Sequence, residues 1–378
     1  MKFAFCLFRY YPFGGLERNF LNIVNEALRQ GHEVHIFAWG WSGLAPEGAQ
    51  LKVLPVRGYS NHGRSLSFVR QLRSHLEAGQ FDLVVGFNRM PGLDLYYCAD
   101  VCFTQQAMRK HSRLYKLTPR YRTFAGFEKA VFSPDSTTEI MFLSRQTKEE
   151  YQAVYGTPEE RFHELPPGIN KDAIRQALAE DRRTPVRQEL GIAQDGLMLV
   201  MVGSDFKRKG VSRAIHALGA LPERLQVKTK LVVIGKGKEE GLKRLAETLG
   251  VGEQVVFTGP RSDVPRFLAA ADALLHLAES ENTGNAIVEG LIAGLPVLVT
   301  RNCGYYFHVQ DARAGVVVGD PVFDQEDFNA VLSASLGNPE QLKQWGKNAL
   351  AYSDQVDLYS RPQKAVLVME KLVAGRRR

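Results

Sequence analysis

Residues 2–37 read KFAFCLFRYYPFGGLERNFLNIVNEALRQGHEVHIF, and this stretch decides the fold. An apolar run at 2–8 is followed by a glycine turn at 14–15, apolar residues at helical spacing over 16–28, and a second apolar run at 34–37. This order of strand, glycine turn, helix and strand predicts a βαβ unit with parallel strands.

The same alternation continues to the end of the chain. Further apolar runs predict strands in two series, at 83–87, 95–99 and 139–143, and then at 197–202, 231–234, 255–258, 273–277, 297–300 and 316–318. Near residue 165, Leu-Pro-Pro-Gly-Ile-Asn can continue neither a helix nor a strand, so it marks a linker. Because 378 residues exceed the usual size of one core, we predict an α/β protein with two doubly wound, Rossmann-like domains.

The predicted domains cover residues 1–166 and 167–354. Residues 355–378 form a helix and a basic tail that pack back toward the first domain. The carboxyl ends of the two sheets are expected to face each other across a cleft, because loops at these ends are where ligands of doubly wound sheets bind.

Composition narrows the class of protein. Hydrophobic residues make up 44% and charged residues 24%, values of a globular protein without a membrane span. The N-terminal apolar run is interrupted by Arg9 and is too short for a signal peptide. Four cysteines without paired or zinc-type spacing predict a reduced cytoplasmic compartment and no disulfide. No two aspartates stand at D-x-D spacing, so no metal site is expected.

Two motifs indicate chemistry. The loop Gly203–Gly210, GSDFKRKG, follows the predicted strand 197–202 and precedes a helix, so its amides and cations suit a diphosphate; a solvated basic turn is the alternative. The stretch 279–290, ESENTGNAIVEG, places Glu281 and Glu289 on either side of a glycine loop, and carboxylates accept hydrogen bonds from sugar hydroxyls. Together the motifs describe a sugar nucleotide site, unless Glu289 merely faces solvent.

The spacing Glu281-x(7)-Glu289 followed by AGLPV, the Lys-Gly at 209–210, the Gly-Gly turn and the Pro-Pro-Gly linker resemble the retaining glycosyltransferases of family 4, which have the GT-B fold. Four N-terminal strings are similar to the branch of this family that adds the first hexose to heptose in the lipopolysaccharide core: FCLFRYYPFGGL, NHGR at 61–64, VGFNRMPGLD at 85–94 and ADVC at 99–102. The resemblance implies metal-independent, retaining transfer of a hexose, glucose foremost, from a UDP-sugar to inner-core heptose in α-1,3 linkage, without a cofactor.

The resemblance also implies roles for residues, with the acceptor in the first domain and the donor in the second. Asp100, after a strand, becomes the candidate base or positioning acid for the acceptor hydroxyl. The donor set is Glu281 for the transferred sugar, Glu289 for ribose, Arg208 and Lys209 for the diphosphate, Arg261 for the uracil pocket, and Gly14, Gly15, Thr283, Gly284 and Asn285 for the loops beside the donor.

Three departures from the family pattern bear on this transfer of roles. Ser204 replaces the usual arginine after Gly203, which leaves less positive charge for the diphosphate. Asn19 stands where relatives can carry an aspartate, and an amide cannot serve as a base. The usual Glu-Gly-Phe-Gly is Glu281-Asn-Thr-Gly here, followed by Asn285, so UDP-N-acetylhexosamine (GalNAc or GlcNAc) is the alternative donor.

The positive charge is concentrated in residues 101–132, which carry +6 of the net +7. This segment suits anionic lipid at about 1 kcal/mol per cation, nucleic acid, or no partner at all. The implied acceptor is a phosphorylated lipid of the inner leaflet, which favours peripheral docking on the cytoplasmic face of the inner membrane and no nucleic acid. The docking residues are Arg109, Lys110, Arg113, Lys116, Arg120 and Arg122.

Other classes of function have weaker signals. Gly235, Gly237 and Gly241 imitate a dinucleotide fingerprint, but the spacing is G-x-G-x-x-x-G and the preceding strand is not the first of its domain. An NAD(P)-dependent oxidoreductase and a non-catalytic basic binding protein therefore remain as alternatives. The hexose, its linkage, the acceptor's phosphorylation, the oligomeric state and the choice between same-face attack and an enzyme nucleophile stay open.

Overall fold

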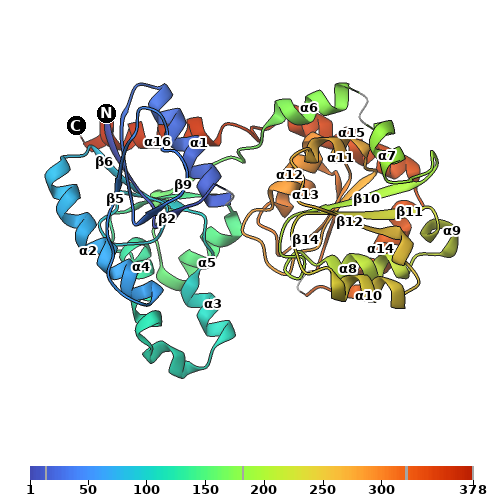
Figure 1. The fold of residues 1–378 in the computed structure, drawn as a ribbon, viewed down its shortest axis with the longest axis horizontal. Helices are drawn as coiled ribbons and strands as arrows, with labels where there is room; N and C mark the ends of the chain where they lie inside the picture. The colour runs from blue at the N-terminus through green and yellow to red at the C-terminus, as the bar shows by residue number, and fades with distance from the viewer. Residues whose placement is uncertain (13–14, 181–182, 320–321, 377–378) are drawn as a thin grey trace. The chain divides into compact units, whose positions relative to one another are not determined.

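The structure of the protein is a computed structural model (Figure 1). It describes residues 1–12, 15–180, 183–319 and 322–376. The chain forms two compact units. The first unit comprises Met1–Gly168 together with Ser360–Arg378, and the second comprises Ile169–Tyr359. The last helix therefore belongs to the same unit as the first strand.

The first unit is built on a parallel sheet of seven strands in the order β5-β3-β1-β6-β7-β8-β9. Its strands are β1 Lys2–Cys6, β3 Glu33–Ala38, β5 Gln50–Val53, β6 Leu83–Gly86, β7 Leu95–Cys98, β8 Glu139–Phe142 and β9 Phe162–Glu164, and a separate pair is β2 Arg9–Tyr10 with β4 Gly40–Trp41. Its helices are α1 Gly15–Arg29, α2 Asn61–Gly79, α3 Phe103–Lys110, α4 Pro119–Phe132, α5 Arg145–Tyr155 and α16 Arg361–Arg376, with 3₁₀ turns η1 Arg113–Leu117 and η2 Glu159–Arg161.

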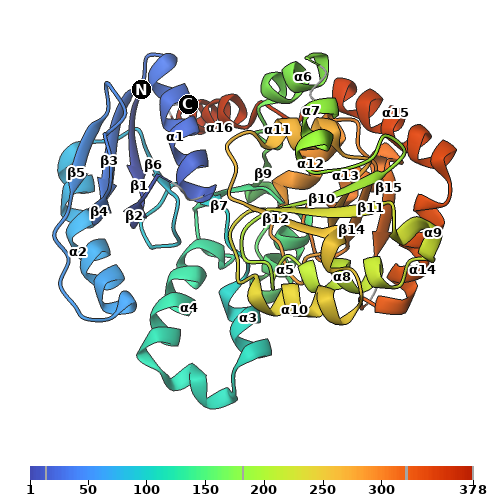
Figure 2. The same cartoon turned by 45° about the vertical axis from the view of Figure 1, so that its right-hand side comes forward.

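Helices cover both faces of this sheet because successive strand side chains point to opposite sides. Phe3 and Phe5 of β1 pack into one buried cluster with α1 and α16, whereas Ala4 and Cys6 pack into another with α2, α4 and α5. Figures 1 and 2 both show α16 beside α1. Gln363 of α16 also donates a hydrogen bond to Glu26 of α1 at 3.4 Å.

The second unit has a parallel sheet of six strands in the order β12-β11-β10-β13-β14-β15. The strands are β10 Leu197–Val202, β11 Thr229–Ile234, β12 Val255–Gly259, β13 Ala273–His276, β14 Val297–Thr300 and β15 Gly315–Val318. The helices are α6 Lys171–Ala179, α7 Arg183–Glu189, α8 Val211–Gly219, α9 Glu223–Gln226, α10 Glu240–Thr248, α11 Val264–Ala270, α12 Asn285–Ile292, α13 Tyr306–Ala312, α14 Gln325–Leu336 and α15 Pro339–Gln355, with η3 Gly252–Gln254.

The predicted α/β fold with two Rossmann-like halves is confirmed, and each predicted apolar run forms a strand. Two strands of the seven-stranded sheet, β5 and β9, were not predicted, and neither was the separate pair of β2 and β4. Three of the four residues of β5 are exposed, and β9 has only three residues, so neither carries an apolar run. All four cysteines are buried and free. Within the described residues, no helix combines the length and the apolar character that crossing a membrane requires.

The strand orders show where ligands can bind. The order reverses between β1 and β6 in the first sheet and between β10 and β13 in the second. Loops leaving the carboxyl ends of such neighbouring strands run in opposite directions and open a crevice, which is where open α/β sheets bind ligands. The loops after β10 and β13 are the two motif loops of the sequence.

Candidate active site

The loop after β10 presents two cations at the edge of the second sheet. Gly203 has φ +147°, and a Cβ atom placed on it would lie 2.7 Å from Cε of Lys209. Lys209 therefore lies against the start of its own loop, which only glycine permits. The loop ends at Gly210, the residue before α8, so it combines the amides of a helix N-terminus with the two cations.

Glu281, in the loop after β13, joins the two motifs by ion pairs. Its Oε2 atom accepts a hydrogen bond from Nη1 of Arg208 at 2.6 Å and another from Nζ of Lys209. The side chains of Glu281 and Lys209 are 15% and 13% exposed, whereas Arg208 is 41% exposed. The cluster thus has a buried half, Glu281 with Lys209, and an arginine that reaches solvent.

Backbone hydrogen bonds fix the loop that carries Glu281. Its amide donates to the carbonyl of Asn302 at 3.0 Å, and its carbonyl accepts from the amide of Gly304 at 3.0 Å. The amide of Glu279 donates to the carbonyl of Arg208 at 2.8 Å. Because the loop is bonded to the loops after β10 and β14, the carboxylate is held in place before any ligand arrives.

Charge and burial act in opposite directions on this carboxylate. Burial alone would raise the pKa of Glu281, but the charges of Lys209 and Arg208 outweigh burial, and the net pKa shift is downward. Glu281 is therefore ionised at neutral pH, and its free hydrogen-bonding capacity is that of an acceptor. Such an anion is suited to sugar hydroxyls and not to proton donation.

His276, the last residue of β13, lies under the same loop and was not predicted as a site residue. It is 2% exposed, and its Nε2 atom has no hydrogen-bond partner among the described residues. Burial, followed by the charge of Lys209, lowers the pKa of His276 to about 3. The ring is therefore neutral. A histidine that ends an apolar strand before a ligand loop was the available signal in the sequence.

The start of α12 carries the rest of the second motif. Gly284 precedes the helix with φ +94°, and a Cβ there would lie 2.8 Å from Ile287 and 3.3 Å from Nε2 of His276. Asn285 begins the helix, and its buried Oδ1 has no hydrogen-bond partner in the described part of the chain. Glu289 lies one turn later on the same helix face. Thr283 accepts a hydrogen bond at its carbonyl from the amide of Tyr305 at 2.8 Å.

The structure places the remaining predicted donor residues as follows. Arg261 is the second residue after β12, at the carboxyl edge of the sheet, and its guanidinium pairs with both oxygens of Asp263 at 2.8 and 2.9 Å. Gly15 begins α1, and no described atom would lie within 4 Å of a Cβ on it. Gly14 lies outside the described residues.

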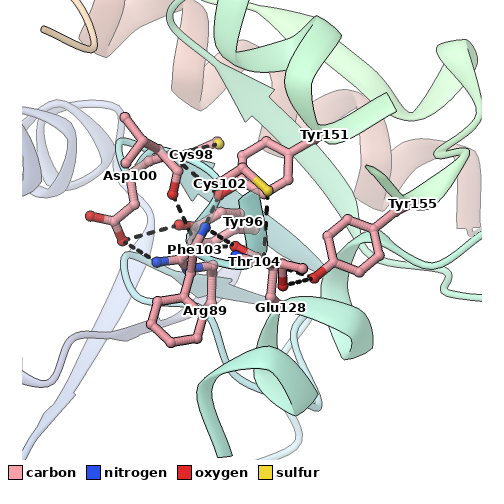
Figure 3. Close-up of polar contacts among 11 residues, drawn as sticks. Arg89, Tyr96, Cys98, Asp100, Cys102, Phe103, Thr104, Glu128, Tyr151 and Tyr155 are labelled. Carbon is pink, nitrogen blue, oxygen red and sulfur yellow. Dashed lines mark hydrogen bonds and ion pairs between the residues drawn. The ribbon is translucent and has the colours of Figure 1, made fainter. Parts of the chain in front are cut away.

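Asp100 follows β7 in the first unit, and Figure 3 shows its carboxylate beside Arg89. The side chain of Asp100 is 43% exposed. Its Oδ2 atom lies 3.7 Å from Nη2 of Arg89, and the hydroxyl of Tyr96 donates to the same oxygen at 3.5 Å. Arg89 follows β6. Asp100 thus combines an accessible carboxylate with a cation that keeps it oriented, a combination suited to binding a hydroxyl.

We call residues 103–132 the basic hairpin; it comprises α3, η1 and α4. Its inner side is buried, with Phe127, Val131 and Phe132 at 6%, 0% and 0% exposure. Its outer side carries apolar side chains that are 53%, 73% and 61% exposed, those of Met108, Leu114 and Leu117. Exposed cations lie among them, namely Arg109, Arg113, Lys116, Arg120, Arg122 and Lys129. The side chain of Lys110 is outside the described part of the structure.

Two of the three glycines that imitate a dinucleotide fingerprint, Gly235 and Gly237, have a packing role. A Cβ on Gly235 would lie 2.2 Å from the carbonyl oxygen of Gly203, and one on Gly237 would lie 2.3 Å from the ring of Phe206. The loop after β11 therefore packs its backbone directly against the loop that carries Lys209. This contact accounts for Gly235 and Gly237 without a dinucleotide.

Comparison with known proteins defines the class as glycosyltransferase. Residues 182–351 match the family described as glycosyl transferases group 1, and residues 13–173 match glycosyltransferase family 4. The chain is also similar to the lipopolysaccharide glucosyltransferase WaaG of Escherichia coli (strain K12), with 43% identity over 365 residues that cover 97% of each chain. The chain therefore belongs to the WaaG family of GT-B glycosyltransferases, as the sequence resemblance predicted.

Solved structures agree with this family. A crystal structure of WaaG, described as a glycosyltransferase involved in lipopolysaccharide biosynthesis, superposes with a TM-score of 0.86 at 42% identity and covers 97% of this chain and 99% of its own. HepE of Anabaena in complex with UDP superposes with a TM-score of 0.74 at 17% identity, covering 98% of this chain and all of its own, and shares the fold. The oxidoreductase and the non-catalytic alternatives are thereby set aside.

The substitution Gly203→Ala, which adds one methyl group beside Lys209, tests the position of the Lys209 side chain. In Gly203→Ala the new Cβ must displace the Lys209 side chain, so we expect UDP to bind about tenfold more weakly while the protein stays folded. Calorimetric titration with UDP measures this. Gly241→Ala is the control, because its Cβ meets no described atom within 4 Å; equal affinity in both variants would contradict the placement.

Proposed function

We propose that the protein is a retaining hexosyltransferase that moves a hexose, glucose foremost, from a UDP-sugar to heptose of the lipopolysaccharide inner core in α-1,3 linkage. The observation that carries the proposal is the ion cluster of Glu281, Arg208 and Lys209 at the switch point between β10 and β13. The identity of 43% with a relative named as a lipopolysaccharide glucosyltransferase supports the choice of sugar and acceptor.

In this proposal each part of the site has one task. Arg208, Lys209 and the amides before α8 bind the diphosphate and stabilise the negative charge that develops when the bond from sugar C1 to the diphosphate oxygen breaks. Glu281 accepts hydrogen bonds from hydroxyls of the transferred sugar, and Glu289 accepts them from ribose. Arg261 lines the uracil pocket. Asp100 orients the acceptor hydroxyl.

Retention follows if the acceptor attacks on the face that the diphosphate leaves. The new bond then joins sugar C1 to the acceptor oxygen, and the hydroxyl proton passes to an oxygen of the departing UDP. We infer that no metal takes part, because two cations and a helix N-terminus supply the positive charge that a divalent ion supplies in other sugar-nucleotide enzymes. No cofactor is required for this balance.

A specific observation favours a second donor. Oδ1 of Asn285 is buried without a partner in the described residues, beside Gly284 and the neutral ring of His276. A buried acceptor without a donor is costly, and the N–H of an acetamido group is one donor that could satisfy it. UDP-GalNAc and UDP-GlcNAc are therefore the alternative donors on the same acceptor.

The test is a transfer assay with purified protein and deep-truncated lipopolysaccharide core. UDP-Glc, UDP-Gal, UDP-GlcNAc and UDP-GalNAc are each supplied with EDTA and, separately, with Mg²⁺ or Mn²⁺, and the product is analysed by mass spectrometry and NMR. We expect an α-linked hexose with equal rates in EDTA and in metal. A rate abolished by EDTA would refute the metal-independent mechanism, and no product from any donor would refute the function.

We further propose that the basic hairpin docks on anionic lipid at the cytoplasmic face of the inner membrane. Its outer side combines exposed cations with Leu114 and Leu117, and this combination lets charge attract the surface while apolar side chains insert. The acceptor then reaches the enzyme in the plane of the membrane.

Reversing the charge of the hairpin should release the protein from vesicles. With Arg109, Arg113, Lys116, Arg120 and Arg122 all changed to Glu, we expect binding to phosphatidylglycerol vesicles to fall by at least about 10³-fold, at roughly 1 kcal/mol per cation. Sedimentation measures binding, and hydrolysis of the donor should not change. The control reverses five exposed cations of the second unit, namely Lys228, Lys243, Arg244, Lys343 and Lys347; equal loss in the control would contradict docking by the hairpin.

A further inference from the structure

One fully buried carboxylate, Glu128 of α4, ties the basic hairpin to the body of the first unit (Figure 3). It accepts hydrogen bonds from the amides of Phe103 and Thr104 in the first turn of α3, at 2.7 and 2.9 Å. It also accepts one from the hydroxyl of Tyr155 on α5 at 2.7 Å. A carboxylate from α4 therefore satisfies amides that α3 itself leaves unbonded, and it joins three helices.

The same carboxylate forms an ion pair with Arg89, which extends from the loop after β6. Nη1 of Arg89 donates to Glu128, to the carbonyl of Val101 at 3.2 Å and to the hydroxyl of Tyr151 at 3.0 Å. Its other terminal nitrogen, Nη2, lies 3.7 Å from Oδ2 of Asp100. The guanidinium of Arg89 thus contacts two carboxylates. One terminal nitrogen pairs with Glu128 of the hairpin, and the other lies near Asp100, the candidate residue for binding the acceptor hydroxyl.

The carboxylates of Glu128 and Asp100 differ in exposure, so Arg89 links a buried group to a group that solvent can reach. Glu128 is 0% exposed and Arg89 is 17% exposed, whereas Asp100 is 43% exposed. The buried end is rigid because Glu128 also bonds to three residues that belong to helices, namely Phe103 and Thr104 of α3 and Tyr155 of α5. The exposed end is free to meet a ligand, and its geometry follows from where Arg89 is held. A planar guanidinium transmits such a constraint well, because its two terminal nitrogens cannot move independently.

We propose that Glu128 and Arg89 are positioning residues for Asp100. The packing of the basic hairpin against the rest of the first unit then sets the position of the Asp100 carboxylate, and with it the geometry of acceptor binding. The inference deepens the proposed function and rests on the role given there to Asp100. Glu128 and Arg89 do not touch the acceptor; they act through Asp100. If the hairpin packed less tightly, Arg89 would lose its fixed position, and the carboxylate of Asp100 would lose its orientation.

The test uses the full-length protein and the transfer assay with saturating donor. Glu128→Gln keeps the shape of the side chain and removes its charge, and we expect kcat/KM for the acceptor to fall at least about tenfold, since a displacement of 1 Å can cost about a hundredfold. The affinity for UDP should change less than twofold. Glu26→Gln is the matched control, because Glu26 is also a buried carboxylate of this unit, 6% exposed, paired with Arg29 at 2.6 Å on α1.

A double-mutant cycle separates positioning from general loss of stability. In the Asp100→Asn background, Glu128→Gln should cause less than a twofold further loss, because its effect passes through a carboxylate that is already absent. If Glu128→Gln is too unstable to purify, Arg89→Lys serves instead. It keeps a charge for Glu128 but loses the second nitrogen near Asp100, and the same dependence on Asp100 is expected.

The outcomes distinguish this inference from the proposed function. Additive losses in the cycle, or an equal loss in Glu26→Gln, would overturn the positioning role while leaving the transferase intact. An Asp100→Asn variant with unchanged acceptor kcat/KM would remove the basis of the inference. Absence of transfer by the unmutated protein with every donor would instead refute the proposed function itself.

Discussion

Transfer by Glu281→Ala should be slower than transfer by the unmutated protein by about 10² to 10³-fold at saturating donor. Two losses combine in this variant. The sugar loses an ionised acceptor that is fixed by the surrounding loops, and Lys209 and Arg208 lose the carboxylate that orients them. Lys209 is only 13% exposed, so in this variant its charge is left unpaired in a region of low dielectric. Its side chain is then no longer held in one position by Glu281.

The rate of transfer and the affinity for UDP together identify the cause of the loss. UDP lacks the sugar, so its affinity should change little or even rise when both cations are released from Glu281. Glu279→Ala is the control, because Glu279 is an exposed acid two residues earlier in the same loop. If Glu281→Ala transfers as fast as Glu279→Ala, this carboxylate does not contact the sugar, and the assignment of the site is wrong.

The fold could be predicted because buried parallel strands are continuous apolar runs that need no knowledge of their neighbours. β10, LMLVMV, is such a run, and β14, VLVT, is another. The order of the strands could not be read in this way. β10 lies between β11 and β13 because of tertiary packing, and only that order shows that the loops after β10 and β13 meet at a switch point.

The structure brings part of the predicted donor set together. Arg208, Lys209 and Glu281 lie together, although Glu281 is 72 residues from Lys209 in the sequence. The predicted uracil residue Arg261 lies at the same sheet edge, with its guanidinium on Asp263. Glu128 was missed because a charged residue within a basic, aromatic segment looks solvated until the fold buries it. Arg89 was missed because the string VGFNRMPGLD does not show that its side chain reaches Glu128 and Asp100. The roles of all these residues remain predictions.

The basic hairpin is a second feature that the sequence predicted only in part. Its charge was evident from the sequence, and the structure adds that the apolar residues divide between a buried side with Phe132 and an exposed side with Leu114. Exposed leucines among cations favour a lipid surface over a solvated flank, because solvation of a helix needs no apolar side chain. The hairpin therefore has an inner side that includes Glu128 and an outer side on which exposed leucines lie among cations.

Lys209→Ala should be the most damaging change of a cation in the site. We expect kcat to fall by about 10² to 10³-fold, because the departing diphosphate loses a charge that acts from a buried position. Arg208→Ala should cost less, by about tenfold, since Arg208 is 41% exposed and solvent screens its charge. The difference between the two neighbours is thus a difference of burial, not of charge.

Single-turnover kinetics with saturating UDP-sugar separates this effect from weaker binding. A cation that stabilises the leaving group lowers kcat and kcat/KM together, whereas one that only binds the donor raises KM and leaves kcat unchanged. Lys207→Ala is the matched control, because Lys207 is an exposed cation of the same loop and should cost less than twofold. If Lys207→Ala and Lys209→Ala have equal kcat values, the buried cation does not assist departure of UDP, and the charge that replaces a metal must come from elsewhere in the protein.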